Sequence, residues 1–200
     1  MNYIEKLQKL INKKDGIITT KEVVELGIPR QYLNIFIEKN ILERLERGTY
    51  ITPGTFEDEM YILQKKFQKI VFSHETALYL HNLTDRDPIN YSVTLPQGYN
   101  LKNLEKYNVN IHWTKKENYD LGLTKSKTNF GREIKVYDKE RTICDIVKNR
   151  NNMDKDLFKN SLKAYISNKD KNLNKLIEYS KKLKIEKVLR KYLEMILWKI

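Results

Sequence analysis

Hydrophobic residues in the first 40 positions recur every three or four residues, which predicts three short helices. The first covers residues 3–13. The second begins at Thr20, whose hydroxyl is expected to cap it, and ends at Gly27, because glycine tolerates the left-handed conformation that ends many helices. The third begins at Pro29, whose missing N–H costs nothing in the first turn of a helix. The pattern therefore predicts two helices joined by a tight turn, preceded by a third.

Two short segments after these helices predict an antiparallel ribbon. Its strands are expected over residues 41–45 and 49–51, and its turn, at residues 46–48, contains Arg47. Ile17-Ile18 is expected to pair with this ribbon as a third short strand. A helix, a strand, two helices and a basic ribbon, in this order, are typical of a winged helix-turn-helix, which we assign to residues 1–55.

The rest of the chain, residues 56–200, is predicted to form a second domain of mixed structure. A helix over residues 56–67 is expected to bridge the two domains. Alternation with a period of two predicts strands between residues 89 and 137, and helical periodicity returns over residues 154–200. The predicted fold class is α+β, with an N-terminal winged helix-turn-helix followed by a mixed α+β C-terminal domain that ends in a helical, lysine-rich tail.

The net charge of +12 is concentrated in that tail. Residues 1–55 carry nine Lys/Arg against seven Asp/Glu, and residues 56–145 carry fourteen against thirteen. Residues 146–200 carry fifteen against six. The tail is therefore a second candidate surface for nucleic acid or an acidic partner, and the alternative is a solvated lysine face on packed helices.

The outward side of the third helix carries side chains that suit contacts with DNA bases. A recognition helix presents its N-terminal residues to the major groove, where Arg30 is suited to guanine and Gln31 and Asn34 to adenine. Arg44 and Arg47 on the ribbon are expected to contact the phosphate backbone or the minor groove. The alternative is a winged helix that serves only for packing or protein contacts.

Other functional classes find little support in the sequence. The single cysteine, Cys144, lies among apolar residues and is expected to be buried, which fits a reducing compartment. His74 and His81 are seven residues apart and His112 is isolated, so we expect no metal site and no cofactor. Arg141 and Asp145, one helical turn apart, are expected to form a surface or partly buried ion pair. With no apolar run of membrane-span length and no signal peptide, we expect a cytoplasmic protein without a membrane partner.

One enzymatic alternative is a metal-dependent nuclease fused to the winged helix. Glu133 and Lys135 form a Glu-x-Lys sequence on a predicted strand, and Asp120 lies upstream. Such a nuclease needs acidic residues and a lysine at one strand end to hold the cation and activate water. However, Asp120 lies in a polar loop and the other two residues alternate with apolar neighbours as solvent-facing strand residues do. We therefore expect a protein without catalytic residues.

Three stretches of the sequence resemble one known family, the AbiEi-type antitoxins of abortive-infection (type IV) toxin–antitoxin systems. They are LGIPRQYLNIFIEKNILERLERGTYITP, SHETALYLHNL and IKVYDKERTICDIVK. The resemblance implies a repressor that binds inverted repeats in its own promoter as double-stranded DNA. It also implies a C-terminal domain that counteracts a nucleotidyltransferase-like toxin, with a direct complex left open. A solitary regulator without a toxin is the alternative. The resulting candidate DNA-binding residues are Thr20, Arg30, Gln31, Tyr32, Asn34, Arg44, Arg47 and Tyr50.

Overall fold

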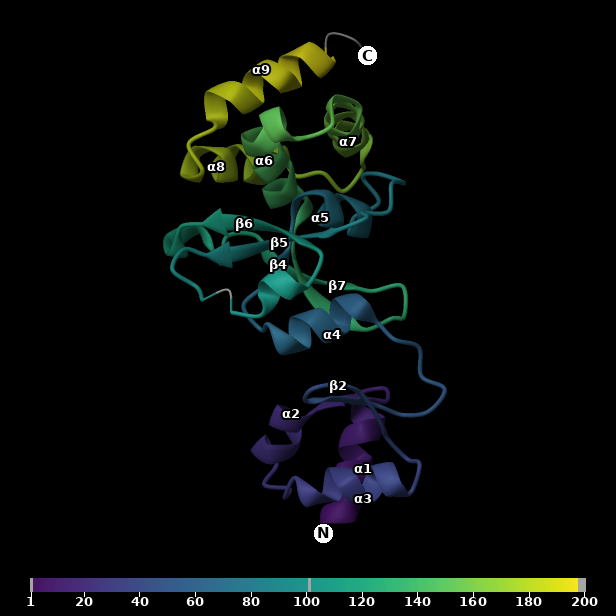
Figure 1. Ribbon diagram of the computed structural model, residues 1–200. Coiled ribbons are helices and arrows are strands. Elements are labelled where there is room, and N and C mark those ends of the chain that lie inside the picture. The colour runs from purple at the N-terminus through teal and green to yellow at the C-terminus, as the bar shows by residue number, and fades with distance from the viewer. Residues whose placement is uncertain (1, 101, 198–200) are drawn as a thin grey trace. The chain divides into compact units, whose positions relative to one another are not determined.

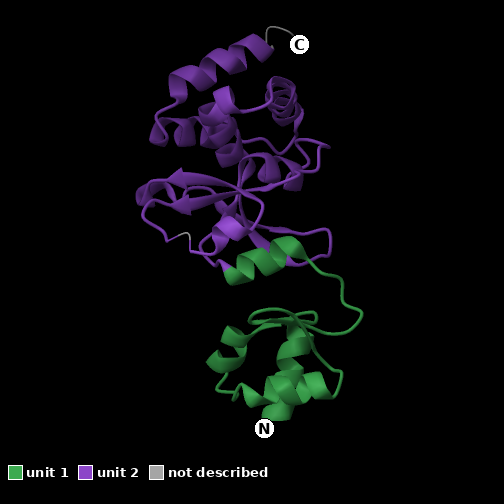
Figure 2. Ribbon diagram, in the orientation of Figure 1, with its two compact units in different colours: residues 1–66 green, residues 67–200 purple. Residues whose placement is uncertain are grey.

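The computed structural model describes residues 2–100 and 102–197 and divides the chain into two compact units (Figures 1 and 2). The first unit is Met1–Lys66 and the second is Phe67–Ile200. The predicted boundary between residues 55 and 56 lies earlier, so the helix that was expected to bridge the domains belongs to the first unit. Residues 198–200, the end of the predicted tail, lie outside the described residues.

The first unit has the element order of a winged helix. Its elements are α1 (Tyr3–Lys13), β1 (Ile17–Thr19), α2 (Thr20–Glu25), α3 (Gln31–Glu38), β2 (Glu43–Glu46), β3 (Thr49–Ile51) and α4 (Glu59–Lys66). The strands form an antiparallel sheet in the order β1-β3-β2, in which Ile17 pairs with Ile51. The expected third strand is therefore present, and it pairs with β3.

A compact apolar cluster holds helices α1, α2 and α3 together. Leu7, Val23 and Leu33, one from each helix, are at most 1% exposed. Ile18 from β1 and Leu42 from the segment before β2 complete the same cluster. Burying one apolar stripe from each helix leaves the opposite face of α3 to solvent, as the sequence pattern predicts.

The N-cap of the second helix, α2, lies one residue earlier than predicted. Thr19, not Thr20, is the N-cap, and its hydroxyl accepts a hydrogen bond from the Glu22 amide at 3.3 Å. The Glu22 carboxylate accepts one in return from the Thr19 amide at 2.9 Å, which completes a capping box. Thr20 is the first residue inside the helix. The sequence Thr-Thr offers two adjacent caps, and the reciprocal bond from Glu22 selects the first.

The second unit combines a five-stranded mixed sheet with a layer of helices. Its strands are β4 (Val71–Phe72), β5 (Tyr91–Pro96), β6 (Val109–Thr114), β7 (Leu123–Lys127) and β8 (Glu133–Tyr137). Its α-helices are α5 (His74–Leu80), α6 (Lys139–Asn149), α7 (Lys155–Ser167), α8 (Leu173–Lys182) and α9 (Glu186–Leu197). The strand order is β6-β5-β4-β8-β7, with β4–β8 and β5–β6 parallel and the other two pairs antiparallel.

Helix α6 is the centre of the helical layer. Eight consecutive residues, 140–147, are buried, because α6 contacts α5, α7, α8 and α9. Figure 1 shows these helices gathered on one side of the sheet. Cys144 is 0% exposed within this layer, as predicted. The mixed α+β fold class with a helical C-terminal end is confirmed. Each helix in the described part of the chain is too short or too polar to cross a bilayer.

Candidate nucleic-acid interface

Helix α3 presents a polar face to solvent. Leu33 and Phe36 are each 1% exposed and anchor the helix to the core of the first unit. Arg30, which directly precedes α3, and Gln31 and Asn34 within it are exposed. The structure therefore brings together the three side chains predicted to contact bases, at the beginning of the helix, where groove-facing residues of a recognition helix lie.

The ribbon of β2 and β3 places two more arginines in solvent. Arg44 lies on β2, next to an irregularity in the pairing with β3, and Arg47 lies in the turn. Gly48 completes the turn with a φ of +84°, a conformation that favours glycine. Its carbonyl accepts a hydrogen bond from the Thr20 amide at 2.9 Å, which fixes the tip of the ribbon to the beginning of α2. Thr20 thus positions the ribbon through its backbone.

The two tyrosines of the predicted site are partly packed into the protein. The rings of Tyr32 and Tyr3 lie 5.2 Å apart at an angle of 52°. Tyr50 lies at the middle of β3, opposite Ile18 and Arg44 on the flanking strands, and it packs against the apolar cluster. Each tyrosine is half-buried. They support the fold as well as bordering the candidate interface.

Glu22 fixes the beginning of α2 through charged contacts. Its carboxylate accepts hydrogen bonds from Lys65 Nζ at 2.5 Å and from the Thr19 amide, and it lies 3.5 Å from Lys14 Nζ. Burial acts to raise the pKa of Glu22, but the hydrogen bond and charge of Lys65 and the hydrogen bonds from Thr19 together outweigh it, so the pKa lies below its ordinary value. The carboxylate is therefore charged at neutral pH, and its contacts tie the beginning of α2 to Lys14 and Lys65.

The residues of the nuclease alternative lie apart in the second unit. Glu133 pairs with Lys127 in the register of β7 and β8, whereas Leu123, just after Asp120, pairs with Tyr137. Asp120 and Glu133 therefore lie at opposite ends of this strand pair, about 13 Å of strand apart. Glu133 also forms an ion pair with Lys125 at 2.6 Å. The structure does not assemble these residues into one cluster.

The histidines are arranged differently from the prediction. His112 is not isolated, because its ring stacks on that of His74 with 3.5 Å between the centroids. Burial, with the nearby His112, lowers the pKa of His74 to about 3, so its imidazole is neutral at pH 7. His81 lies elsewhere and contacts the Tyr137 carbonyl through Nε2 at 2.7 Å. Residues 2–100 and 102–197 contain no group of three or more side chains suited to hold a metal ion.

The Arg141–Asp145 ion pair is buried, which corrects the prediction of a surface or partly buried pair. Arg141 Nε donates to Asp145 Oδ1 at 2.9 Å, and the two side chains are 2% and 7% exposed. The spacing of the two residues predicts the pair. Its burial comes from Asn118 and Leu121, whose carbonyls accept from Arg141 Nη1 and which lie some twenty residues upstream in the chain.

Most lysines of the helical tail are exposed. Lys159 and Lys163 on α7 and Lys181 on α8 are examples. Lys175 is an exception, because its ammonium lies 2.9 Å from Asp138 and also approaches Glu140. The described part of the tail thus has a basic surface, and one of its lysines ties α8 to the beginning of α6.

A comparison with known protein families finds a match within the first unit. Residues 5–53 match the family model of the AbiEi antitoxin transcriptional regulators. A comparison with curated proteins finds no match. Among solved structures, this chain is similar to the RV2827C protein from Mycobacterium tuberculosis, with 11% sequence identity and a TM-score of 0.49. The alignment covers 96% of this chain and 80% of the chain of that protein. The resemblance predicted from the sequence is confirmed for the first of its three stretches: residues 5–53 are similar to the AbiEi antitoxins, a family of transcriptional regulators.

Proposed function

We propose that this protein is a repressor that binds inverted repeats in its own promoter through the first unit. Arg30, Gln31 and Asn34 contact base edges in the major groove, and Arg44 and Arg47 contact phosphates or the minor groove. The observation that carries this proposal is the two-sided nature of α3. Its apolar side is buried in the core, and its exposed side begins with arginine and glutamine, which match base edges in hydrogen-bond geometry.

The proposal extends to an antitoxin role for the second unit. In this role, the second unit counteracts a nucleotidyltransferase-like toxin in the cytoplasm, either through a direct complex or by another route. The exposed lysines of α7–α9 support this role as a surface for an acidic or nucleic-acid-bound partner. We assign no catalytic step to this chain, because Glu133 is tied to Lys125 and is separated along the strands from Asp120.

The DNA-binding proposal is tested by a mobility-shift titration on the protein's own upstream region. Scrambled DNA serves as competitor, and single-base variants of the repeats serve as probes. Arg30→Ala is expected to weaken binding by about 1–3 kcal/mol and to relax the preference at one base position. The matched control is Arg86→Ala, an exposed arginine of the second unit paired with Asp154. Equal binding to own and scrambled DNA, or an equal loss on all probes, contradicts the proposal.

The antitoxin proposal needs a separate readout, which is growth of cells that express a neighbouring nucleotidyltransferase-like toxin. Replacing Lys159, Lys163 and Lys181 by glutamine is expected to reduce toxin rescue and to leave repression of a reporter unchanged. Arg30→Ala is expected to have the reverse effect. If the glutamine variant rescues growth fully, the lysines form only a solvated face, and the proposal that they act against the toxin is wrong.

A further inference from the structure

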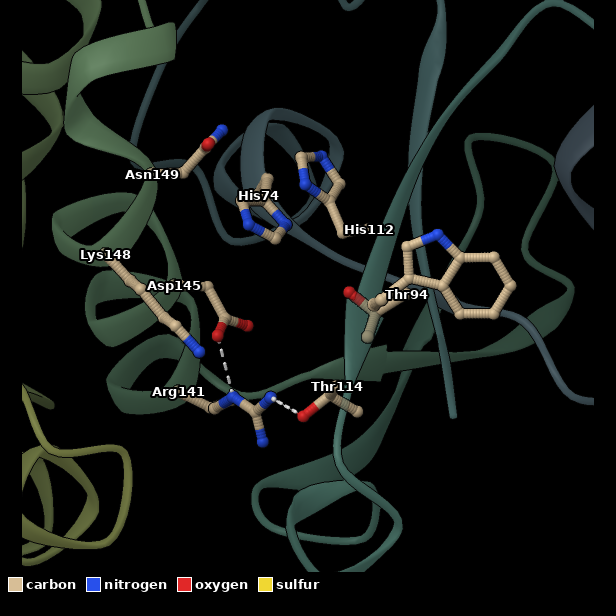
Figure 3. Close-up of a pocket in the computed structure, with 9 residues that line it drawn as sticks. His74, Thr94, His112, Thr114, Arg141, Asp145, Lys148 and Asn149 are labelled. Atoms are coloured by element: carbon tan, nitrogen blue, oxygen red, sulfur yellow. Dashed lines mark hydrogen bonds and ion pairs between the residues drawn. The ribbon is translucent and has the colours of Figure 1, made fainter. Parts of the chain in front are cut away.

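The second unit contains a partly open pocket of about 230 Å³ beside the buried ion pair of α6 (Figure 3). Several elements around it supply charged or polar side chains, including Thr94 on β5. The beginning of α5 gives His74, β6 gives His112 and Thr114, and α6 gives Arg141, Asp145 and Lys148. The three α6 residues recur at intervals of one helical turn, so they lie on one face of that helix.

Asp145 has a carboxylate oxygen without a hydrogen-bond partner. The residue is 5% exposed, and its Oδ1 accepts from Arg141, but its Oδ2 is buried without any donor. Nε2 of His112, on the same pocket, is also buried and unpaired. Buried polar atoms normally have partners, because hydrogen bonds to water that are lost on burial must be replaced. The pocket therefore offers a ligand an unused acceptor.

The charge of the pocket favours an anion. Burial lowers the pKa values of His74 and His112, so both imidazoles are neutral at pH 7. Among the side chains that line the pocket, two cations, Arg141 and Lys148, then oppose the carboxylate of Asp145, and Glu75 adds a negative charge outside the lining. Four of the five N–H donors of Arg141 already bond to Asp145, Thr114 and two backbone carbonyls, so this arginine acts on a ligand mainly through its positive charge. Lys148 is exposed and its ammonium makes no hydrogen bond or ion pair with another described residue, so it can bind a ligand directly.

A free cation does not fit this arrangement. One oxygen of Asp145 is committed to Arg141, and the second cation, Lys148, lies on the same helix face. A ligand must therefore combine a negative charge with a hydrogen-bond donor. Among small anions, hydrogen phosphate has both, because it keeps one proton at neutral pH.

We propose that this pocket binds a phosphate group accompanied by a hydroxyl, either as free hydrogen phosphate or as a small phosphorylated molecule with a hydroxyl of its own. Lys148 Nζ donates to the phosphate oxygens. The Thr114 hydroxyl, which accepts from Arg141 at 3.4 Å, donates its proton to the same group. The ligand hydroxyl donates to Asp145 Oδ2. The volume is several times the roughly 30 Å³ that one water occupies in the liquid, which leaves room for a short substituent.

Sulfate distinguishes this site from a merely basic surface. It has the shape and charge of hydrogen phosphate but no proton to donate, so its oxygens face the Asp145 carboxylate without a hydrogen bond. In calorimetric titrations of the full chain at equal ionic strength, inorganic phosphate is expected to bind at least about a hundredfold more tightly than sulfate. Equal affinities for the two anions would overturn the proposal.

A third titration, with ribose 5-phosphate, identifies the source of the phosphate group. Tighter binding than that of inorganic phosphate indicates a phosphorylated molecule, and weaker binding indicates free phosphate. If neither ligand binds, the proposal is wrong. This site does not depend on DNA binding by the first unit, so its failure leaves that proposal intact.

Two variants assign the contacts. Lys148→Gln is expected to weaken phosphate binding about tenfold, because it removes one charge-assisted hydrogen bond. Lys159→Gln, an exposed lysine of α7 that does not line the pocket, is the matched control. Asp145→Asn is expected to admit sulfate, since the amide supplies a donor. If that variant does not fold, the comparison of Lys148→Gln with its control still tests whether the pocket binds phosphate specifically. Equal losses in the two lysine variants exclude a specific site.

Discussion

In the first unit, the side chains of Arg30, Arg44 and Arg47 are exposed and make no hydrogen bond or ion pair with another described residue. In the second unit, Arg141 is 1% exposed, its side chain donates four hydrogen bonds, and its guanidinium lies 4.2 Å from the centre of the Tyr137 ring. The comparison separates two uses of one residue type. An arginine with all its donors in solvent is available to a partner, whereas one whose guanidinium uses four of its five N–H donors inside the protein holds the fold together.

The largest expected effect comes from removing the buried arginine. Arg141→Ala leaves the Asp145 carboxylate buried without its counter-charge, and it frees the carbonyls of Asn118 and Leu121. The variant is expected to lower the free energy of unfolding of the second unit by about 3–5 kcal/mol, measured by urea denaturation followed by circular dichroism.

The matched control for that loss is Arg86→Ala. The side chains of Arg86 and Asp154 are 59% and 54% exposed, so the pair is expected to contribute about 1 kcal/mol or less. Comparable losses in the two variants would mean that the buried pair adds nothing specific to the second unit.

A drop in pH tests the same region through the neutral imidazole of His74. Burial lowers its pKa to about 3 from 6.5, so below pH 6.5 the unfolded chain binds a proton that the folded chain does not. The second unit is expected to lose stability as the pH falls, by about 2 kcal/mol from this group at pH 5. His81 and His112 act in the same direction, whereas Asp145, whose pKa is raised by burial, acts in the opposite one.

His74→Asn isolates that contribution in denaturation curves at several pH values. Asparagine tolerates the positive φ of +48° at this position. The variant is expected to have a shallower loss of stability between pH 7 and pH 5 than the natural chain. An unchanged slope would show that His74 is protonated as readily in the folded chain as in the unfolded one.

Two glycines with nearly the same positive φ test how tightly Arg141 is enclosed. Gly122 has a φ of +76°, and an added Cβ would lie 2.5 Å from Arg141 Cβ. Gly131 has a φ of +79° and nothing within 4 Å of that position. Gly131→Ala is expected to cost about 1 kcal/mol for the backbone alone. Gly122→Ala is expected to cost about 1–2 kcal/mol more in the same unfolding measurement, because of the clash. Equal costs would indicate a loosely packed arginine.

The sequence predicts the first unit better than the second, and the contacts explain why. In the winged helix, the signals are local, such as Gly27 after α2 and the alternation in the ribbon. Even there, the choice of Thr19 over Thr20 as cap depends on the reciprocal bond from Glu22. In the second unit, the informative contacts join distant segments. The stacking of His74 on His112 depends on α5 and β6 being brought together by the sheet, and no periodicity encodes it.

The smallest expected effect concerns the exposed arginines, and it is measured as a dependence on salt. Arg47 lies at the tip of the ribbon, so its contact with DNA is expected to be with phosphate and independent of sequence. Arg47→Ala is expected to weaken binding to own and scrambled DNA alike and to reduce the slope of log affinity against log salt by about 0.9. Between 50 and 200 mM salt, the variant therefore loses about 3.5-fold less affinity than the natural chain. Lys39→Gln, a charge change at the far end of α3, is the control and is expected to leave the slope unchanged. An unchanged slope in Arg47→Ala would remove the ribbon from the interface and leave α3 as the only element of the first unit assigned to DNA.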